Sequence, residues 1–331
     1  MTKITSPSPV FQAKWPEPLK PTIFGKVAEV IKKVLPLIIF PIGILHFITR
    51  AMIHPASVQT SIISDAARKR IQHLGGKIVQ FKTPDEETLK AAYFKGSSHS
   101  KKGIIHAPGN SANLASPSPR ETIYAEKFLK FARKNVGNVD VLVLNYRGVG
   151  HSTGSSSPQG LALDTYSAGE YLHRRKGIEP SKVLFYGHSL GGYAAVKGGA
   201  FFQKEHATAK VSIVSDRSFS DLANIVHQLF GVVVGALVYL LRWQLDAKAD
   251  WHEFKGRKII IYDKTDQVIP HVASFYKGMQ TYDTNYQLPP MKKNDTIELV
   301  SKGSDAYDPH NRPLNSVEAS KLGREIRSAL F

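Results

Sequence analysis

Apolar positions along the chain switch between two spacings from residue 76 onward. Short, nearly continuous apolar runs, typical of buried strands, alternate with longer segments whose apolar residues recur at helical spacing. The predicted strands are KIVQF and LKAAYF, which form an opening antiparallel hairpin, and then GIIHAPGN, which ends in a loop, VDVLVLNYRG, KVLFYGHS, AKVSIVSDRS, RKIIIYDKTD and DTIELVSKG. Helical segments between them include TIYAEKFLKFARKN, PQGLALDTYSAGEYLHRRK and LGGYAAVKGGAFFQ. Because parallel strands need helices on both faces of the sheet, the pattern predicts one α/β domain over 76–331.

The N-terminal part of the chain has a different pattern. Frequent prolines predict an extended arm over 1–22, and an apolar and basic helical segment follows over 23–75. Its uncharged run, 34–49, would reach about 24 Å as a helix, short of the roughly 30 Å hydrocarbon core of a bilayer. Two interpretations remain open for this run, a helix packed beneath the domain or an interfacial membrane anchor. We expect no cleaved signal peptide, because the run starts far from Met1 and has no obvious cleavage site.

A second apolar run lies inside an insertion over 221–255, which is longer than a simple crossover between strands needs. The 17 residues of 225–241 carry no charge and are apolar on all sides. We expect the insertion to form a helical cap over the mouth of the domain, with Arg242 and Trp243 at its edge. An apolar cap suits an acyl chain that arrives from a bilayer, and the alternative is a buried helix that never meets lipid.

Charge and composition narrow the class of protein further. The 331 residues include 44 Lys and Arg against 27 Asp and Glu, a net charge of +17, and no cysteine. This composition excludes a disordered chain, a collagen and a disulfide scaffold, and it removes thiolate nucleophiles and cysteine zinc sites. The positive charge indicates an acidic partner. Because the cations are dispersed and no nucleic-acid-binding motif occurs, we expect an anionic membrane surface as the partner and no nucleic acid.

The motif most specific to chemistry is the pentapeptide Gly187-His188-Ser189-Leu190-Gly191, between the strand KVLFY and the helix that follows. In this strand–turn–helix context, G-x-S-x-G is a nucleophile elbow. The flanking glycines allow a turn so tight that a side chain would clash there. We therefore predict Ser189 as a nucleophile.

A serine nucleophile needs an acid and a base, which follow it in the order Ser, Asp, His. Asp266 stands just beyond the strand KIIIYD and is the predicted acid. Asp216, at the end of the preceding strand, is the alternative acid, and Asp263 is interpreted as a turn residue.

The predicted base is His310, in the loop that follows the last strand. A histidine in this position can return over the sheet edge to Ser189. His271 is the competitor, but it is too close in sequence to Asp266 for the two side chains to take both roles.

The tetrahedral oxygen of an acyl transfer reaction needs two backbone N–H donors. Leu190, the residue after the nucleophile, is the first predicted donor. Asn110, in the loop after the strand GIIHA, is the second, and the alternative for Gly109-Asn110 is an ordinary turn.

The segments IIHAPGN, NYRGVGHSTG, GHSLGG, KTDQVIP and DPHNRP resemble those of α/β-hydrolase-fold serine hydrolases over about residues 76–325. Within this superfamily the chain is similar to membrane-associated hydrolase-domain proteins, including protein depalmitoylases and lysophospholipid lipases. It also resembles, more loosely, uncharacterised hydrolase-like proteins of Chlamydia and Legionella. The resemblance implies a Ser-His-Asp triad, a cap and no cofactor. The chain departs from the pattern at Ala107-Pro108, where close relatives carry His-Gly.

These observations predict a membrane-associated, bacterial effector-like serine hydrolase that cleaves an acyl ester or thioester. It would act on the cytoplasmic side of a membrane or after delivery to a host cell, without a metal. One alternative is a soluble small-ester hydrolase or peptidase. Another is a catalytically silent hydrolase-fold interaction protein.

Overall fold

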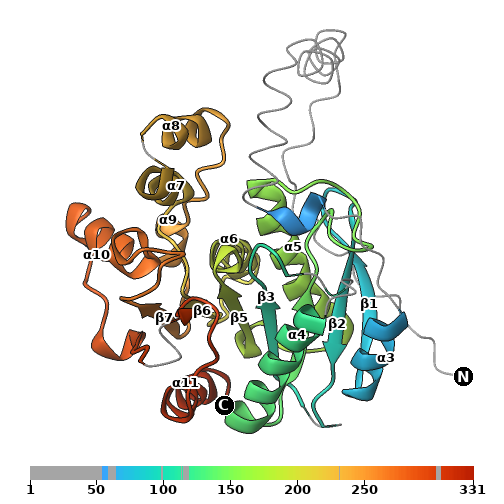
Figure 1. Ribbon diagram of the computed structural model, residues 1–331. Helices are drawn as coiled ribbons and strands as arrows, with labels where there is room; N and C mark the ends of the chain where they lie inside the picture. Colours follow the sequence, from blue (N-terminus) through green and yellow to red (C-terminus); the bar gives the residue numbers. More distant parts are fainter. Residues whose placement is uncertain are drawn as a thin grey trace, which may run out of the picture. The chain divides into compact units, whose positions relative to one another are not determined.

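One central sheet organises the chain from residue 76 onward (Figure 1). The structure, a computed structural model, describes residues 54–58, 65–97, 100–112, 114, 119–230, 232–302 and 307–331. Within these residues the sheet has eight strands in the order β1-β2-β4-β3-β5-β6-β7-β8. The strands are β1 (Gly76–Lys82), β2 (Thr88–Phe94), β3 (Gly103–Ala107), β4 (Asp140–Leu144), β5 (Val183–His188), β6 (Ser212–Asp216), β7 (Lys258–Asp263) and β8 (Thr296–Leu299).

The register of the strands agrees with the predicted topology. Strands β1 and β2 pair antiparallel, β2 pairs antiparallel with β4, and every pair from β4 to β8 is parallel. Parallel strands have their carboxyl ends at the same edge of a sheet, and that edge is where loops in open α/β sheets form binding sites. The predicted α/β class with a mostly parallel sheet is confirmed.

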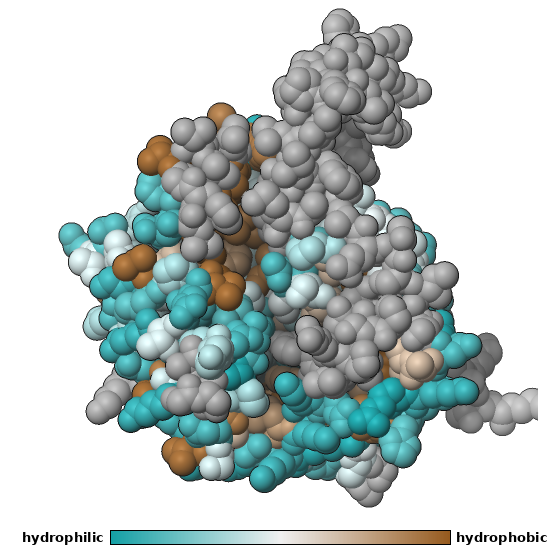
Figure 2. Space-filling model, in the orientation of Figure 1, coloured by the Kyte–Doolittle hydropathy of each residue, from teal (hydrophilic) through white to brown (hydrophobic). Residues whose placement is uncertain are grey.

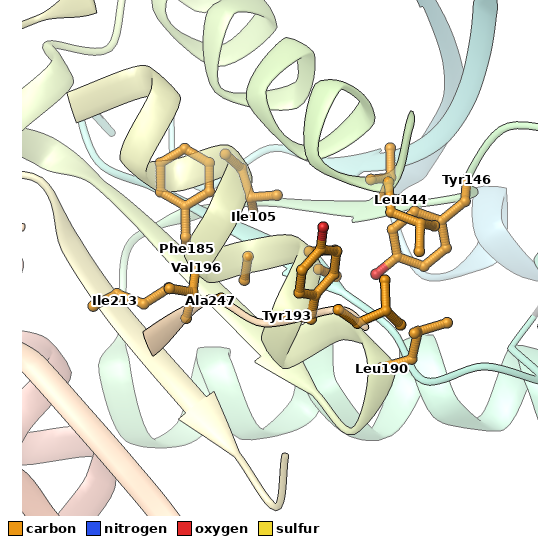
Figure 3. Packing of buried hydrophobic residues seen from close by; sticks show 14 of the residues in the cluster. Ile105, Leu144, Tyr146, Phe185, Leu190, Tyr193, Val196, Ile213 and Ala247 are labelled. Carbon is orange, nitrogen blue, oxygen red and sulfur yellow. The ribbon is translucent and has the colours of Figure 1, made fainter. Parts of the chain in front are cut away.

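Helices pack on both faces of this sheet, as the continuous apolar strands require. Along β5, Phe185 enters one hydrophobic cluster with residues of α5 and α6, and Leu184 enters the other cluster with residues of α4 and α11. Figure 3 shows Phe185, Ile105 and Tyr193 within the first cluster. The described helices are α3 (Asp65–His73), α4 (Pro119–Phe131), α5 (Pro158–Glu170), α6 (Leu190–Glu205), α7 (Leu222–Phe230), α8 (Val232–Leu240), α9 (Lys248–Trp251), α10 (Phe275–Asn285) and α11 (Ser316–Leu330).

The insertion between β6 and β7 contains α7, α8 and α9. The predicted single apolar run over 225–241 is divided between two helices, because α7 ends at Phe230 and α8 begins at Val232. Helix α7 buries Leu222, Ile225 and Val226 in the first cluster, whereas His227 is exposed. This segment is therefore a helical pair rather than one uniformly buried helix.

Helix α8 leaves large apolar side chains in contact with solvent. Val232, Tyr239 and Leu240 are 66%, 64% and 73% exposed. Figure 2 shows brown, apolar atoms at the upper left, where Figure 1 draws α8. None of the helices in the described part of the chain is both long enough and apolar enough to cross a bilayer. The predicted arm over 1–22 and the apolar run over 34–49 lie outside the described residues.

Candidate active site

Ser189 lies at the turn between β5 and α6, with φ of 54° and ψ of −122°. This backbone conformation is unfavourable for a residue with a side chain and costs about 1–3 kcal/mol. A Cβ atom on Gly187 would lie 2.0 Å from the carbonyl oxygen of Gly191, and one on Gly191 would lie 2.0 Å from that of Ala107. Both flanking positions must therefore be glycine, which agrees with the predicted elbow.

His310 and Asp266 continue a hydrogen-bonded chain from Ser189. The Nε2 atom of His310 lies 2.9 Å from the Ser189 Oγ atom, and its Nδ1 atom lies 2.7 Å from Asp266 Oδ2. The three residues come from the loops after β5, β7 and β8, and all three are buried. The structure thus brings together the three residues that the sequence singled out as nucleophile, base and acid.

The partners of the His310 ring define its tautomer. A carboxylate can only accept a hydrogen bond, so the Nδ1 atom of His310 carries the proton and donates it to Asp266. The Nε2 atom then presents a lone pair to the hydroxyl of Ser189. The other oxygen of Asp266 accepts from the amides of Val268 and Ile269, both at 2.9 Å. These amides hold the carboxylate in place beside the imidazole.

The alternative acid, Asp216, is bonded elsewhere. Its two oxygens accept from the Arg217 guanidinium at 2.8 and 3.0 Å, and Tyr186 donates to it at 2.7 Å. Burial by itself would raise the pKa of Asp216, but the charge and hydrogen bonds of Arg217 outweigh burial and hold the pKa well below its ordinary value. Asp216 is therefore ionised and paired with Arg217.

Asp263 and His271, the other two residues weighed as acid and base, bond to or pack against side chains outside the triad. Asp263 accepts from the amide and hydroxyl of Thr265, as the predicted turn residue would. The ring of His271 packs 5.7 Å from that of Tyr262, and burial lowers the pKa of His271. Neither residue has a described hydrogen bond to the His310 ring.

The two predicted oxyanion donors, the amides of Leu190 and Asn110, belong to different elements next to the elbow. Leu190 is the first residue of α6, where backbone N–H groups have no partner within the helix. In the loop after β3, a Cβ atom on Gly109 would lie 3.6 Å from the Ser189 Cβ atom. Sequence reasoning chose Asn110 and missed how close Gly109 lies. The role of the Asn110 amide stays a prediction, and its carbonyl accepts from the amide of Ala56 at 3.3 Å.

Two more side chains at the site were not singled out in the sequence as partners of the base. His188, within the elbow, has its Nε2 atom 3.0 Å from the carbonyl oxygen of His310. Burial lowers the pKa of His188 to about 3, so the ring is neutral and Nε2–H is the donor. Arg217 contacts the same loop through its guanidinium. Their partners are backbone carbonyls far away in sequence, which no local motif reveals.

Metal-binding geometry is absent from this part of the molecule. Across the described ranges, no group of three or more His, Asp or Glu side chains is arranged to hold a metal ion.

Comparison with known proteins gives the family. A family model described as Chlamydia CHLPS protein (DUF818) matches residues 96–282, more than half of the chain. The chain belongs to this family. The matched residues of the CHLPS family include the elbow and Asp266, and His310 lies beyond them. The predicted resemblance to chlamydial hydrolase-like proteins is confirmed.

The chain is also similar to curated proteins from other bacteria. The uncharacterised protein YfhR of Salmonella typhi is 32% identical over 174 residues, which cover 50% of this chain and 55% of YfhR. The chain thus spans little more than half the length of this curated relative.

Solved structures share the fold at low identity. An alpha-beta hydrolase from Vibrio vulnificus has a TM-score of 0.58 at 17% identity, covering 86% of this chain and 92% of its own. An esterase of Pyrococcus furiosus has a TM-score of 0.54 at 16% identity, with coverage of 78% and 93%. The predicted α/β-hydrolase fold is confirmed, and this fold supports a hydrolytic function.

Proposed function

We propose that this CHLPS-family protein is a serine hydrolase that cleaves an acyl ester or thioester through an acyl-enzyme. The observation that carries the proposal is the hydrogen-bonded chain from Ser189 through His310 to Asp266. A buried serine in a strained turn, next to a histidine that an ionised acid orients, is the arrangement that activates a hydroxyl as a nucleophile.

The proposed reaction has two halves. Ser189 Oγ attacks the acyl carbon while His310 Nε2 accepts the hydroxyl proton, and the tetrahedral oxygen faces the Leu190 amide. His310 then gives this proton to the departing alcohol or thiol, and the acyl group remains on Ser189. In the second half His310 takes a proton from water as the water oxygen attacks the acyl carbon. The bond between the acyl carbon and Ser189 Oγ then breaks, His310 returns the proton to Oγ, and the carboxylic acid leaves. Asp266 stabilises the imidazolium in both halves.

Labelling with a fluorophosphonate probe tests the proposal, because the probe reacts with activated serines. The wild-type protein should be labelled, and Ser189→Ala and His310→Ala should not. Ser328→Ala is the matched control, since Ser328 is exposed on α11 and should leave labelling intact. A wild-type protein that folds but is not labelled would overturn the proposal in favour of a silent binding module.

We further propose that the substrate is reached at an anionic membrane surface. Support comes from α8, where Val232, Tyr239 and Leu240 are exposed, and from the exposed Arg242 that follows them. Apolar side chains next to a cation suit the boundary between headgroups and acyl chains. The net charge of +17 acts in the same direction.

Vesicle binding tests this part of the proposal. Vesicles containing phosphatidylglycerol should bind the protein and speed its labelling, and neutral phosphatidylcholine vesicles should do so less. A double change, Tyr239→Ser with Leu240→Ser, should weaken binding, whereas Val317→Ser on α11, where Val317 is 76% exposed, should not. Equal binding of both variants would remove α8 as the docking element.

A further inference from the structure

The backbone that carries His310 is held by side chains from two other strands of the sheet. The Nη1 atom of Arg217 donates to the carbonyl oxygens of Pro309 at 3.1 Å and Arg312 at 2.9 Å. His188 Nε2–H donates to the carbonyl oxygen of His310 at 3.0 Å. Carbonyls on both sides of His310, and its own, are therefore fixed from the body of the domain.

Arg217 is held firmly enough to act as a clamp. It follows β6, and its guanidinium forms two hydrogen bonds with Asp216, at 2.8 and 3.0 Å. Both side chains are almost fully buried, with exposed fractions of 6% and 3%. The Arg217 amide also donates to the Ile261 carbonyl at 2.8 Å. Because Asp216 balances the charge of Arg217, the clamp adds no net charge beneath the His310 ring.

The backbone of Arg217 is itself unusual. Its φ of 45° lies in the left-handed region, which a residue with a long side chain rarely adopts. Such strain persists where the surrounding structure requires it, and it often accompanies a functional contact. Here the strained residue is the one whose side chain reaches the two carbonyls of the histidine loop.

The same loop is also attached to α11 by a buried ion pair. The guanidinium of Arg312 bonds to Glu318 of α11 at 2.7 and 2.8 Å. This pair attaches the loop to α11, and it has no described hydrogen bond to Ser189 or to the carbonyl of His310. Arg217, by contrast, bonds to the carbonyls of Pro309 and Arg312 on either side of His310, and His188 bonds to the carbonyl of His310 itself.

We propose that Arg217, together with His188, is a positioning residue that sets the distance and angle between the His310 imidazole and Ser189. The inference rests on the proposed function, since it concerns the base of the same site. A misplacement of about 1 Å in a catalytic group can lower a rate by about 100-fold. The clamp fixes that distance without touching the substrate.

The test uses Arg217→Lys, which keeps the positive charge opposite Asp216. The guanidinium bonds to Asp216 through Nε and Nη2 and to the two carbonyls through Nη1, whereas lysine has one nitrogen and cannot make both sets of contacts. We expect the labelling rate and the kcat for a p-nitrophenyl ester to fall about 10- to 100-fold, with KM little changed. Arg257→Lys is the matched control. Arg257 is also in ion pairs, with Asp295 and Glu325, but it lies directly before β7, at the opposite end of that strand from Asp266, so activity should stay at the wild-type level.

If Arg217→Lys does not fold, a pair of His188 variants tests the same positioning role. His188→Phe removes the donor to the His310 carbonyl, whereas His188→Gln keeps an N–H group that can reach it. We expect labelling to be slow in His188→Phe and largely restored in His188→Gln. If His188 only filled space, the two variants would not differ in labelling rate in this way.

The outcomes separate the two proposals. Absence of labelling in the folded wild-type protein overturns the serine hydrolase function itself. A labelled wild type, together with wild-type rates in folded Arg217→Lys or in folded His188→Phe, overturns the positioning role and leaves the hydrolase function standing.

Discussion

Asp216 ends β6 and Asp266 follows the neighbouring strand β7, and the two carboxylates bond to different partners. Asp266 contacts the ring of His310 at 2.7 Å, whereas Asp216 is bonded to Arg217 and Tyr186. Parallel strands bring both acids to the same sheet edge. The pairing of Asp216 with Arg217 therefore leaves Asp266 as the acid available to the base.

This relationship predicts the result of removing Asp266. Asp266→Asn should lower kcat for ester hydrolysis by about 10³- to 10⁴-fold, because an amide cannot stabilise the imidazolium or fix its tautomer. Asp216 should not substitute for it, since Arg217 holds its oxygens. Asp263→Asn serves as the control, and it should remain within a few-fold of the wild type. A loss below 10-fold in Asp266→Asn would contradict the assignment.

The tight turn around Ser189 predicts that replacing its glycines lowers the free energy of unfolding. Gly191→Ala places a methyl group 2.0 Å from a backbone oxygen, so the elbow must deform, and we expect a loss of about 3 kcal/mol or more of unfolding free energy. At Gly109, a Cβ atom would have its nearest neighbour at 3.4 Å, so Gly109→Ala should cost about 1 kcal/mol or less. Urea denaturation measures both values, and equal losses would show that the elbow can relax.

Buried His106 predicts how stability depends on pH. Burial, with repulsion from His188, lowers the pKa of His106 from 6.5 to about 3. The unfolded chain therefore binds a proton at this ring as pH falls below about 6.5, while the folded ring stays neutral, so stability is lost as pH falls. At pH 5 the loss from this one group is about 2 kcal/mol.

Urea denaturation of the wild type and His106→Leu isolates this contribution, because other titrating groups are common to both. The fall in unfolding free energy between pH 7.5 and pH 5 should be smaller in His106→Leu. An identical fall in the two proteins would mean that His106 titrates normally.

A buried charge cluster at the end of β4 gives a fourth prediction. Arg147 bonds to Asp164 at 2.9 Å and to Asp85 at 2.7 Å, and the Asp164 side chain is fully buried. Arg147→Met leaves that carboxylate without its charge partner, so we expect a loss of about 3–5 kcal/mol.

Adding Asp164→Asn to Arg147→Met should recover part of this stability. In the wild type the backbone N–H of Arg147 donates to Asp164 Oδ2 at 2.7 Å. The side-chain oxygen of the new asparagine can accept the same hydrogen bond from the backbone of residue 147. The comparison of single and double variants by urea denaturation measures the cost of the unpaired charge. If the double variant is no more stable than Arg147→Met alone, the unpaired charge on Asp164 is not the cause of the loss.

Much of the fold was predictable because its signals are local. The strand KIIIYD and the elbow around Ser189 each contain the residues that determine them, and the structure has both where the sequence predicted them. Chain order and strand ends then singled out Asp266 and His310. The run over 225–241 was predicted as part of a helical cap, and the structure has two helices there, α7 and α8.

What the sequence did not reveal depends on contacts between distant backbone atoms. The guanidinium of Arg217 bonds to carbonyls 92 and 95 residues later, and His188 bonds to one 122 residues later. Every residue has a backbone carbonyl, so the sequence does not indicate which carbonyls will accept these hydrogen bonds. The proximity of Gly109 to Ser189 is missed for the same reason.

The separation of 121 residues between Ser189 and His310 also orders events during synthesis of the chain. Domains form as the chain leaves the ribosome, and contacts between distant segments form last. A nascent chain that has reached α6 already contains the strained serine, but its base is made only after β8. Under the proposed mechanism, the growing chain has no hydrolytic capacity until its last loop and α11 have docked, so an unfinished product cannot attack esters in its surroundings.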